Sequence, residues 1–231
     1  MDKITATKIK KISENFFNSA LKLHVSMQCS KYLFDKAIIN WREFESEISI
    51  NYPIKGIGII GTRMNMENPD SSEGGFLYTD EPLGGHEVTD ELQGFPFETA
   101  AAAYLFTALE IFGDEISEIL VGPKLRQYDS WHKFAGPNLD FSDKKSLASV
   151  AGKIAKIFNT PISAFSENFV SRLVLLKIQR NRFAHVGDEI EDFEQFFEDV
   201  ILVALAIYFA VLPNEKKIKV YPYQDLERKF K

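Results

Sequence analysis

The sequence has little that would suit a disulfide-stabilised or membrane-spanning protein. Its 231 residues include one cysteine, Cys29, so an intramolecular disulfide cannot form, and this fits a reducing cytoplasm. We expect Cys29 to be a buried structural residue. The longest apolar run, residues 200–212, is too short to span a bilayer. Residues 1–11 are charged and no apolar segment follows them, so no N-terminal signal pattern is visible.

Sequence motifs for metals and nucleotides are also scarce. No HExxH, Walker A or GxSxG pattern occurs. His24, His86 and His132 have no metal-ligand spacing to cysteine or carboxylates, so we expect no metal site and no cofactor. Residues 56–61 fit G-x-G-x-x-G, but no strand leads into them and no strong helix follows. We therefore interpret these glycines as turn and strand residues.

What the chain does contain is a core rich in phenylalanine and a strong helical signal. Hydrophobic residues make up 45% of the sequence, and twenty of its residues are phenylalanine. Apolar residues at helical spacing over residues 3–48 predict a helical N-terminal extension. Short apolar segments at 48–52 and 57–60 predict a small β-hairpin, and residues 65–94, rich in glycine and acids, predict a long loop. We group residues 1–95 as one N-terminal region.

Residues 96–213 show a second, more regular series of helices. The glycine and proline residues between the apolar stretches leave only short connections, which favours an antiparallel bundle of four to five helices. The predicted helices cover residues 99–120, 124–134, 144–158, a segment that ends at 185, and 193–212. The fourth begins either at Thr160-Pro161 or at Ser166. The fold class is thus mainly α, and residues 214–231 form a short basic tail.

The fourth helix of this series ends in a polar cluster. Its apolar stripes are interrupted in the last two turns by Arg180, Asn181 and His185. A charged group in an apolar stripe is costly unless something pairs with it, which makes these residues a candidate site. Alternatively, they are ordinary basic residues at the negative end of the helix dipole. Glu110, beside the apolar face of helix 99–120, is either a partner for Arg180 or a residue flanking that face.

The run Arg180-Asn181-Arg182-Phe183-Ala184-His185 resembles the Arg-x4-6-His motif of the HEPN superfamily. In that superfamily a polar residue often follows the arginine, the motif ends a long helix, and another long helix follows; the resemblance covers roughly residues 96–212. It implies a helical bundle that dimerises, with the arginine and histidine of both protomers lining one cleft. Relatives paired with a nucleotidyltransferase antitoxin often carry tyrosine two residues after the histidine. Gly187 stands there in this chain, which argues against control by nucleotide transfer.

These residue types suit metal-independent cleavage of RNA. Attack by the 2′-hydroxyl requires a base, an acid and a cation for the developing phosphate charge. His185 suits proton transfer, Arg180 suits the phosphate, and Asn181 is placed to orient either group. We expect Lys177 and Arg182 to bind substrate. One chain supplies one such histidine, so a two-fold homodimer through the motif face and helix 193–212 would bring acid and base together.

The charge distribution favours the same segment. The chain carries a net charge of −6, which counts against a general nucleic-acid-binding protein. Residues 121–186, however, hold eleven lysines and arginines against four acids, a net charge of +7, so the rest carries −13. Either these cations are solvated helix faces, or they form a local surface for a phosphate backbone.

The sequence thus predicts a cytoplasmic, HEPN-like endoribonuclease that acts on RNA, as a toxin or phage-defence effector. The alternative is a non-catalytic HEPN-like module for dimerisation or for binding nucleotides or RNA. An antitoxin or another protein partner is expected, and residues 1–95 are candidates for target or partner selection.

Overall fold

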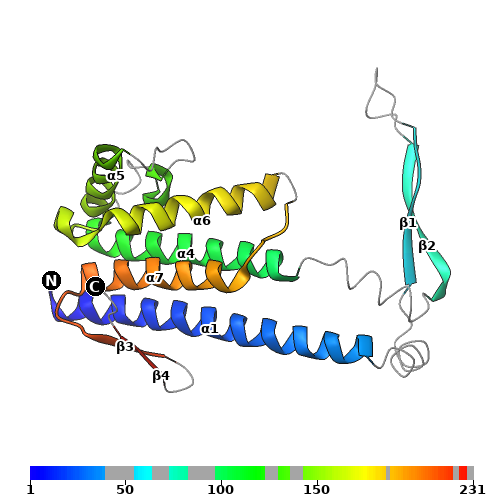
Figure 1. The fold of residues 1–231 in the computed structure, drawn as a ribbon, viewed down its shortest axis with the longest axis horizontal. Coiled ribbons are helices and arrows are strands. Elements are labelled where there is room, and N and C mark those ends of the chain that lie inside the picture. Colours follow the sequence, from blue (N-terminus) through cyan, green and yellow to red (C-terminus); the bar gives the residue numbers. More distant parts are fainter. Residues whose placement is uncertain are drawn as a thin grey trace. The chain divides into compact units, whose positions relative to one another are not determined.

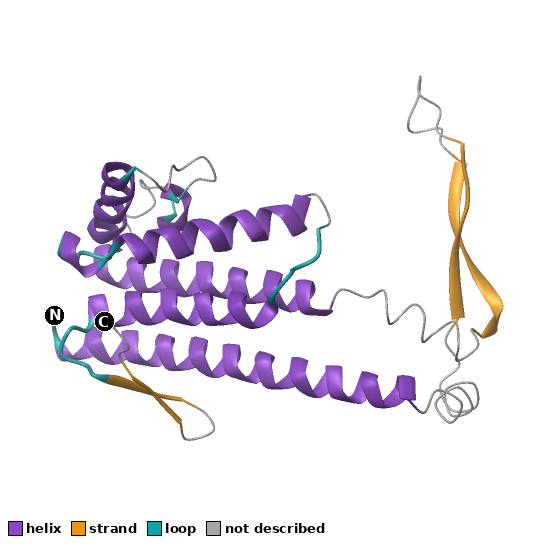
Figure 2. Ribbon diagram, in the orientation of Figure 1, coloured by secondary structure: helices purple, strands orange, loops and turns teal. Residues whose placement is uncertain are grey.

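The computed structural model describes residues 1–39, 55–63, 73–82, 97–122, 130–135, 143–185, 188–220 and 224–227 (Figures 1 and 2). These residues form two compact units, one of residues 1–27 with 96–231 and one of residues 28–95. The first unit is mainly helical, as predicted, and contains the candidate site. Its long helices are the first part of α1 (Lys3–Ile39), α4 (Phe97–Val121), α5 (Lys144–Ile157), α6 (Glu167–His185) and α7 (Phe193–Val211).

In the helical unit, α7 packs against both α4 and α6, and α5 packs against α6. Figure 1 shows α1, α4, α6 and α7 running in alternating directions along the chain, so that successive members are antiparallel. The apolar face of α7 is almost wholly buried, which places this helix in the core of the bundle. Helix 193–212 therefore does not expose the apolar surface that we expected a second copy to cover.

Short polar residues set where the helices begin. The Asp143 side chain accepts a hydrogen bond from the Lys145 backbone N–H at 3.0 Å and caps α5. Asp192 caps α7 in the same way, through the Gln195 backbone N–H at 2.9 Å. Of the two starts predicted for α6, the structure has the later one.

At that start, the Ser166 hydroxyl accepts from the Phe169 backbone N–H at 3.2 Å. At the C-terminal end of α4, Gly122 takes a left-handed conformation with φ of +70°, which ends the helix as the sequence indicates. The helix predicted at 124–134 is described only in part, as the short 3₁₀ helix η3 (Trp131–Phe134).

The N-terminal helix divides the region that we grouped as residues 1–95. Ile9 and Phe17 of α1 are fully buried in the main core, and the Phe16 ring stacks on Phe112 of α4 with centroids 4.6 Å apart. Residues 1–27 are thus part of the bundle itself, whereas 28–39 belong to the second unit. Helix α1 continues without a break through residues 24–30. Cys29 is exposed, contrary to our expectation, because it lies just beyond the packed part of α1.

The second unit contains an antiparallel pair of strands, β1 (Lys55–Arg63) and β2 (Glu73–Pro82). The glycines of residues 56–61 lie within β1, in agreement with their interpretation as strand residues. Strand β2 lies where we predicted a loop, so that part of the prediction was wrong. Residues 48–52, the other predicted arm of the hairpin, lie outside the described residues.

The tail also has regular structure. Strands β3 (Lys217–Val220) and β4 (Gln224–Glu227) pair in antiparallel fashion, and the buried Ile218 and Val220 alternate with the exposed Lys217 and Lys219. The alternation of apolar and basic residues gives the tail one face that packs and one that is solvated. None of the helices in the described ranges combines the length and the apolar character needed to cross a membrane.

Candidate functional site

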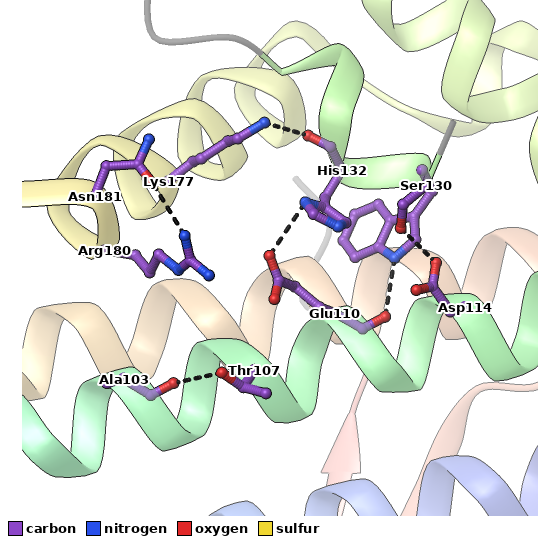
Figure 3. A network of polar contacts seen from close by, with 10 residues as sticks. Ala103, Thr107, Glu110, Asp114, Ser130, His132, Lys177, Arg180 and Asn181 are labelled. Atoms are coloured by element: carbon purple, nitrogen blue, oxygen red, sulfur yellow. Dashed lines mark hydrogen bonds and ion pairs between the residues drawn. The ribbon is translucent and has the colours of Figure 1, made fainter. Parts of the chain in front are cut away.

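Helix α6 places three of the predicted residues on one face. Lys177, Arg180 and Asn181 are spaced by three and four residues, and all three side chains are partly buried. Arg180 donates through Nη1 to the Asn181 side-chain oxygen at 3.2 Å (Figure 3). Asn181 therefore orients the guanidinium group of Arg180, a role we had considered only toward His185 or a phosphate.

Helix α4 faces this cluster with acidic side chains. Glu110 lies on the side of α4 next to α6, and its side chain is 17% exposed. In Figure 3 the guanidinium group of Arg180 points toward the Glu110 carboxylate. Burial raises the pKa of Glu110, while Arg180 and then Lys177 act in the opposite direction. The charges of Glu110 and Arg180 therefore act on each other across the gap between α4 and α6, while the role of Glu110 as a partner for Arg180 stays a prediction.

The short helix η3 brings in a residue that the sequence did not single out. His132 Nδ1 lies 3.2 Å from a Glu110 carboxylate oxygen, and the His132 side chain is 15% exposed. The two atoms are in contact, but their angles do not fit a hydrogen bond, so among the described groups Nδ1 has no hydrogen-bond partner. Since η3 and α6 lie far apart in sequence, no spacing rule relates His132 to Arg180.

Three hydrogen bonds hold η3 against the two long helices (Figure 3). The Trp131 indole N–H donates to the Glu110 carbonyl at 3.2 Å, and the Ser130 hydroxyl donates to Asp114 at 2.7 Å. From α6, Lys177 Nζ donates to the His132 carbonyl at 3.1 Å.

The indole of Trp131 lies directly on Gly113 of α4. A Cβ atom at Gly113 would be 2.2 Å from Trp131 Nε1, so only glycine allows this approach. The glycine thus fixes how close η3, and with it His132, comes to α4.

Burial shifts the pKa values of His132 and Lys177 toward the neutral forms of these two groups. Burial, followed by the charge of Lys177, lowers the pKa of His132 to about 4; Asp114 opposes this shift, and Arg180 and Lys133 add to it. Burial also lowers the pKa of Lys177, against the effect of Glu110. At neutral pH His132 is therefore an uncharged imidazole beside a carboxylate and two cations, an arrangement suited to proton transfer next to an anion.

The other predicted residues are placed differently. Arg182 lies on the exposed side of α6, where its Nε donates to Asp188 at 2.9 Å, and it does not join Lys177 and Arg180. His185 is the last residue of α6, and the placement of its side chain lies outside the described part of the structure. Gly187 is outside the described residues as well.

Only part of the excess positive charge of residues 121–186 is available to bind an anion. Arg172 pairs with Asp199 of α7, as Arg182 does with Asp188, so acids outside the segment offset two of its cations. The exposed cations gather on α5, which contains no acid. Lys145, Lys153 and Lys156 share one face of that helix, opposite its buried apolar residues.

Among the described residues, no group of three or more histidine, cysteine or acidic side chains is arranged to hold a metal ion. A hollow of about 710 Å³ lies elsewhere in the helical unit, where Asp2, Asn159 and Pro213 contribute to its lining. It includes none of the predicted site residues.

Comparisons of the chain with protein-family models, curated proteins and solved structures find no match. The candidate site therefore stands on its own geometry: a cluster of Glu110, His132, Lys177, Arg180 and Asn181 between α4, α6 and η3.

Proposed function

We propose that this chain is a metal-independent endoribonuclease of the HEPN type. The observation that carries the proposal is the partly buried cluster around Arg180, in which Glu110, His132 and Lys177 surround the arginine of the Arg-x4-6-His motif. Partly buried cations beside proton-exchanging groups are what cleavage of a phosphodiester needs. Glycoside or peptide chemistry would not call for two cations in this position.

The proposed reaction is attack of an RNA 2′-hydroxyl on the adjacent phosphorus. Arg180 would stabilise the charge on the phosphate oxygens, and Lys177, on the same face of α6, would bind the same anion. Asn181 holds the Arg180 guanidinium group, to which it is hydrogen bonded. His185 would transfer a proton to the leaving 5′-oxygen. For Arg182, which is engaged by Asp188, we propose at most a contact to RNA outside the reacting phosphate.

We extend the proposal to a cytoplasmic homodimer that joins through the motif face. Helix α7 contributes little to such an interface because its apolar residues are buried within its own chain. A toxin or phage-defence role, controlled by an antitoxin or another protein partner, fits an RNA-cleaving protein whose activity must be restrained.

The second candidate function is a binding module without catalysis. It is favoured by the low exposure of the Glu110 and His132 side chains, 17% and 15%, since a static polar core also looks like this. Such a module would bind a nucleotide or RNA, or dimerise, through the same face.

Cleavage in EDTA distinguishes the two functions. We expect the purified protein to cut RNA and to leave 2′,3′-cyclic phosphate ends. Arg180→Ala should lower the rate by roughly 10²–10³-fold and His185→Ala by roughly 10²–10⁴-fold. His24→Asn is the control, because His24 also contacts a carboxylate, that of Glu194 at 2.7 Å, but is not part of the cluster.

Cleavage that survives His185→Ala would show that the motif is not the site. A folded protein that binds RNA but cuts none would favour the binding module.

A further inference from the structure

The proposed reaction needs two proton transfers, and the Arg-x4-6-His motif supplies one histidine per chain. The cluster contains a second imidazole, that of His132, on the same side of α4 as Arg180 (Figure 3). Its position is fixed by the Trp131 indole on Gly113 and by the hydrogen bond of Lys177 to the His132 carbonyl. These two contacts hold the backbone of His132 against α4 and α6.

The contact between His132 and Glu110 joins the same two chemical groups as the histidine–carboxylate pairs of enzymes that use histidine as a base. A carboxylate next to Nδ1 favours the tautomer with the proton on that nitrogen and stabilises the imidazolium ion once it forms. The separation of 3.2 Å is already within reach of such a bond. Because Nδ1 is buried in contact with Glu110, Nε2 is the ring atom left to exchange a proton with another molecule.

The charged groups around His132 suit a base that works beside an anion. Lys177, Arg180 and Lys133 disfavour the protonated ring, whereas Asp114 favours it and Glu110 lies in contact. The ring is thus neutral in the free protein, which is the form that accepts a proton. A phosphodiester bound by Lys177 and Arg180 would offset their charges and so increase the proton affinity of His132 at the step that needs it.

We propose that His132, in contact with Glu110, is the general base of this site, and that it acts with the acid assigned above to His185. This inference rests on the proposed ribonuclease function. The 2′-hydroxyl proton passes to Nε2 of His132 as the 2′-oxygen bonds to phosphorus. The bond from phosphorus to the 5′-oxygen breaks, and that oxygen takes a proton from His185. The products are a 2′,3′-cyclic phosphate and a free 5′-hydroxyl, and exchange with water restores both histidines.

His132→Asn tests this role directly. The side-chain amide nitrogen of asparagine takes the place of Nδ1, so the contact with Glu110 is kept while the proton-accepting Nε2 is lost. The backbone carbonyl that receives Lys177 is unchanged. We expect kcat to fall by roughly 10²–10⁴-fold with RNA affinity and melting temperature close to wild type.

The pH profile separates a base from a structural residue. In the wild type, kcat/KM should fall on the acidic side with the titration of His132, and in His132→Asn this acidic limb should disappear. Glu110→Gln gives a second measurement that does not depend on the fold of the first variant. Without the carboxylate charge the imidazolium ion is less stable, so the limb should move to lower pH and the rate should drop by roughly ten-fold or more.

The outcomes are distinct. If the wild type cleaves RNA and His132→Asn cleaves it equally well, or keeps the wild-type acidic limb, His132 is not the base and the ribonuclease function stands without it. If His132→Asn loses activity only together with RNA binding or melting temperature, and Glu110→Gln leaves the limb in place, the role is structural and the inference is wrong. If the wild type cuts no RNA, the proposed function and this inference fall together.

Discussion

Replacing Gly113 by alanine tests whether the approach of η3 to α4 is as close as the structure has it. The added Cβ would lie 2.2, 2.3 and 2.9 Å from three atoms of the Trp131 indole. The indole is a rigid group, 1% exposed, and is hydrogen bonded to the Glu110 carbonyl, so it cannot turn aside without moving η3. Overpacking of this kind costs about 1–3 kcal/mol. Alanine regains at most about 1 kcal/mol through its higher helix propensity.

The expected net result for Gly113→Ala is a loss of up to about 2 kcal/mol in the free energy of unfolding. Urea denaturation followed by circular dichroism measures this loss, and the fluorescence of Trp131 reports its displacement. Gly152→Ala in α5 is the matched control, because its nearest contact would be Ile162 Cδ1 at an ordinary 3.9 Å. That variant should gain roughly 0.5–1 kcal/mol.

If Gly113→Ala is as stable as Gly152→Ala, the indole does not lie on α4 as described. The placement of His132 would then need revision as well, since both residues belong to η3.

Two further predictions concern charge. Because the folded-state pKa of His132, about 4, lies below its usual value of 6.5, the unfolded chain binds an extra proton between these limits. Stability should therefore fall as pH drops from about 6.5 to about 4, by roughly 2–3 kcal/mol, and this loss should be largely absent from His132→Asn in urea titrations at several pH values. On α5, the triple change of Lys145, Lys153 and Lys156 to glutamine should weaken RNA binding and lower the slope of log K against log salt by up to about 3. The same change at the exposed Lys3, Lys8 and Lys11 of α1 should leave RNA binding almost unaltered.

The helices were the most predictable part of the fold. Apolar residues at helical spacing and a short polar cap such as Asp192 act within one or two turns, so the sequence indicates them directly. Strand β2 was missed because its residues, 73–82, combine glycines with acids and lack a clear alternation. What stabilises it is pairing with β1, which a local pattern does not record.

The candidate site was predictable on α6 and, for Glu110, on α4, but not on η3. Arg180 and Asn181 stood out because they interrupt an apolar stripe, and Glu110 because it flanks one. His132 had no such signal, since η3 is a four-residue turn without periodicity. The sequence gives one hint of the position of His132: it follows Trp131, a large side chain that can pack against a glycine such as Gly113 of α4. It becomes informative only when the Gly113 contact is known.

The hydrogen bonds that hold η3 to the bundle have a consequence for how this site can change over evolutionary time. Two of them end on backbone carbonyls, those of Glu110 and His132. A backbone carbonyl is present whatever side chain the residue carries. The side chains at positions 110 and 132 can therefore be replaced by others while η3 keeps these two hydrogen bonds. The hydrogen bonds that position η3 therefore do not depend on the side chains that would react. Descendants of this chain can acquire a different chemistry at these two positions, or lose chemistry and retain only a binding surface, without first having to rebuild the bundle.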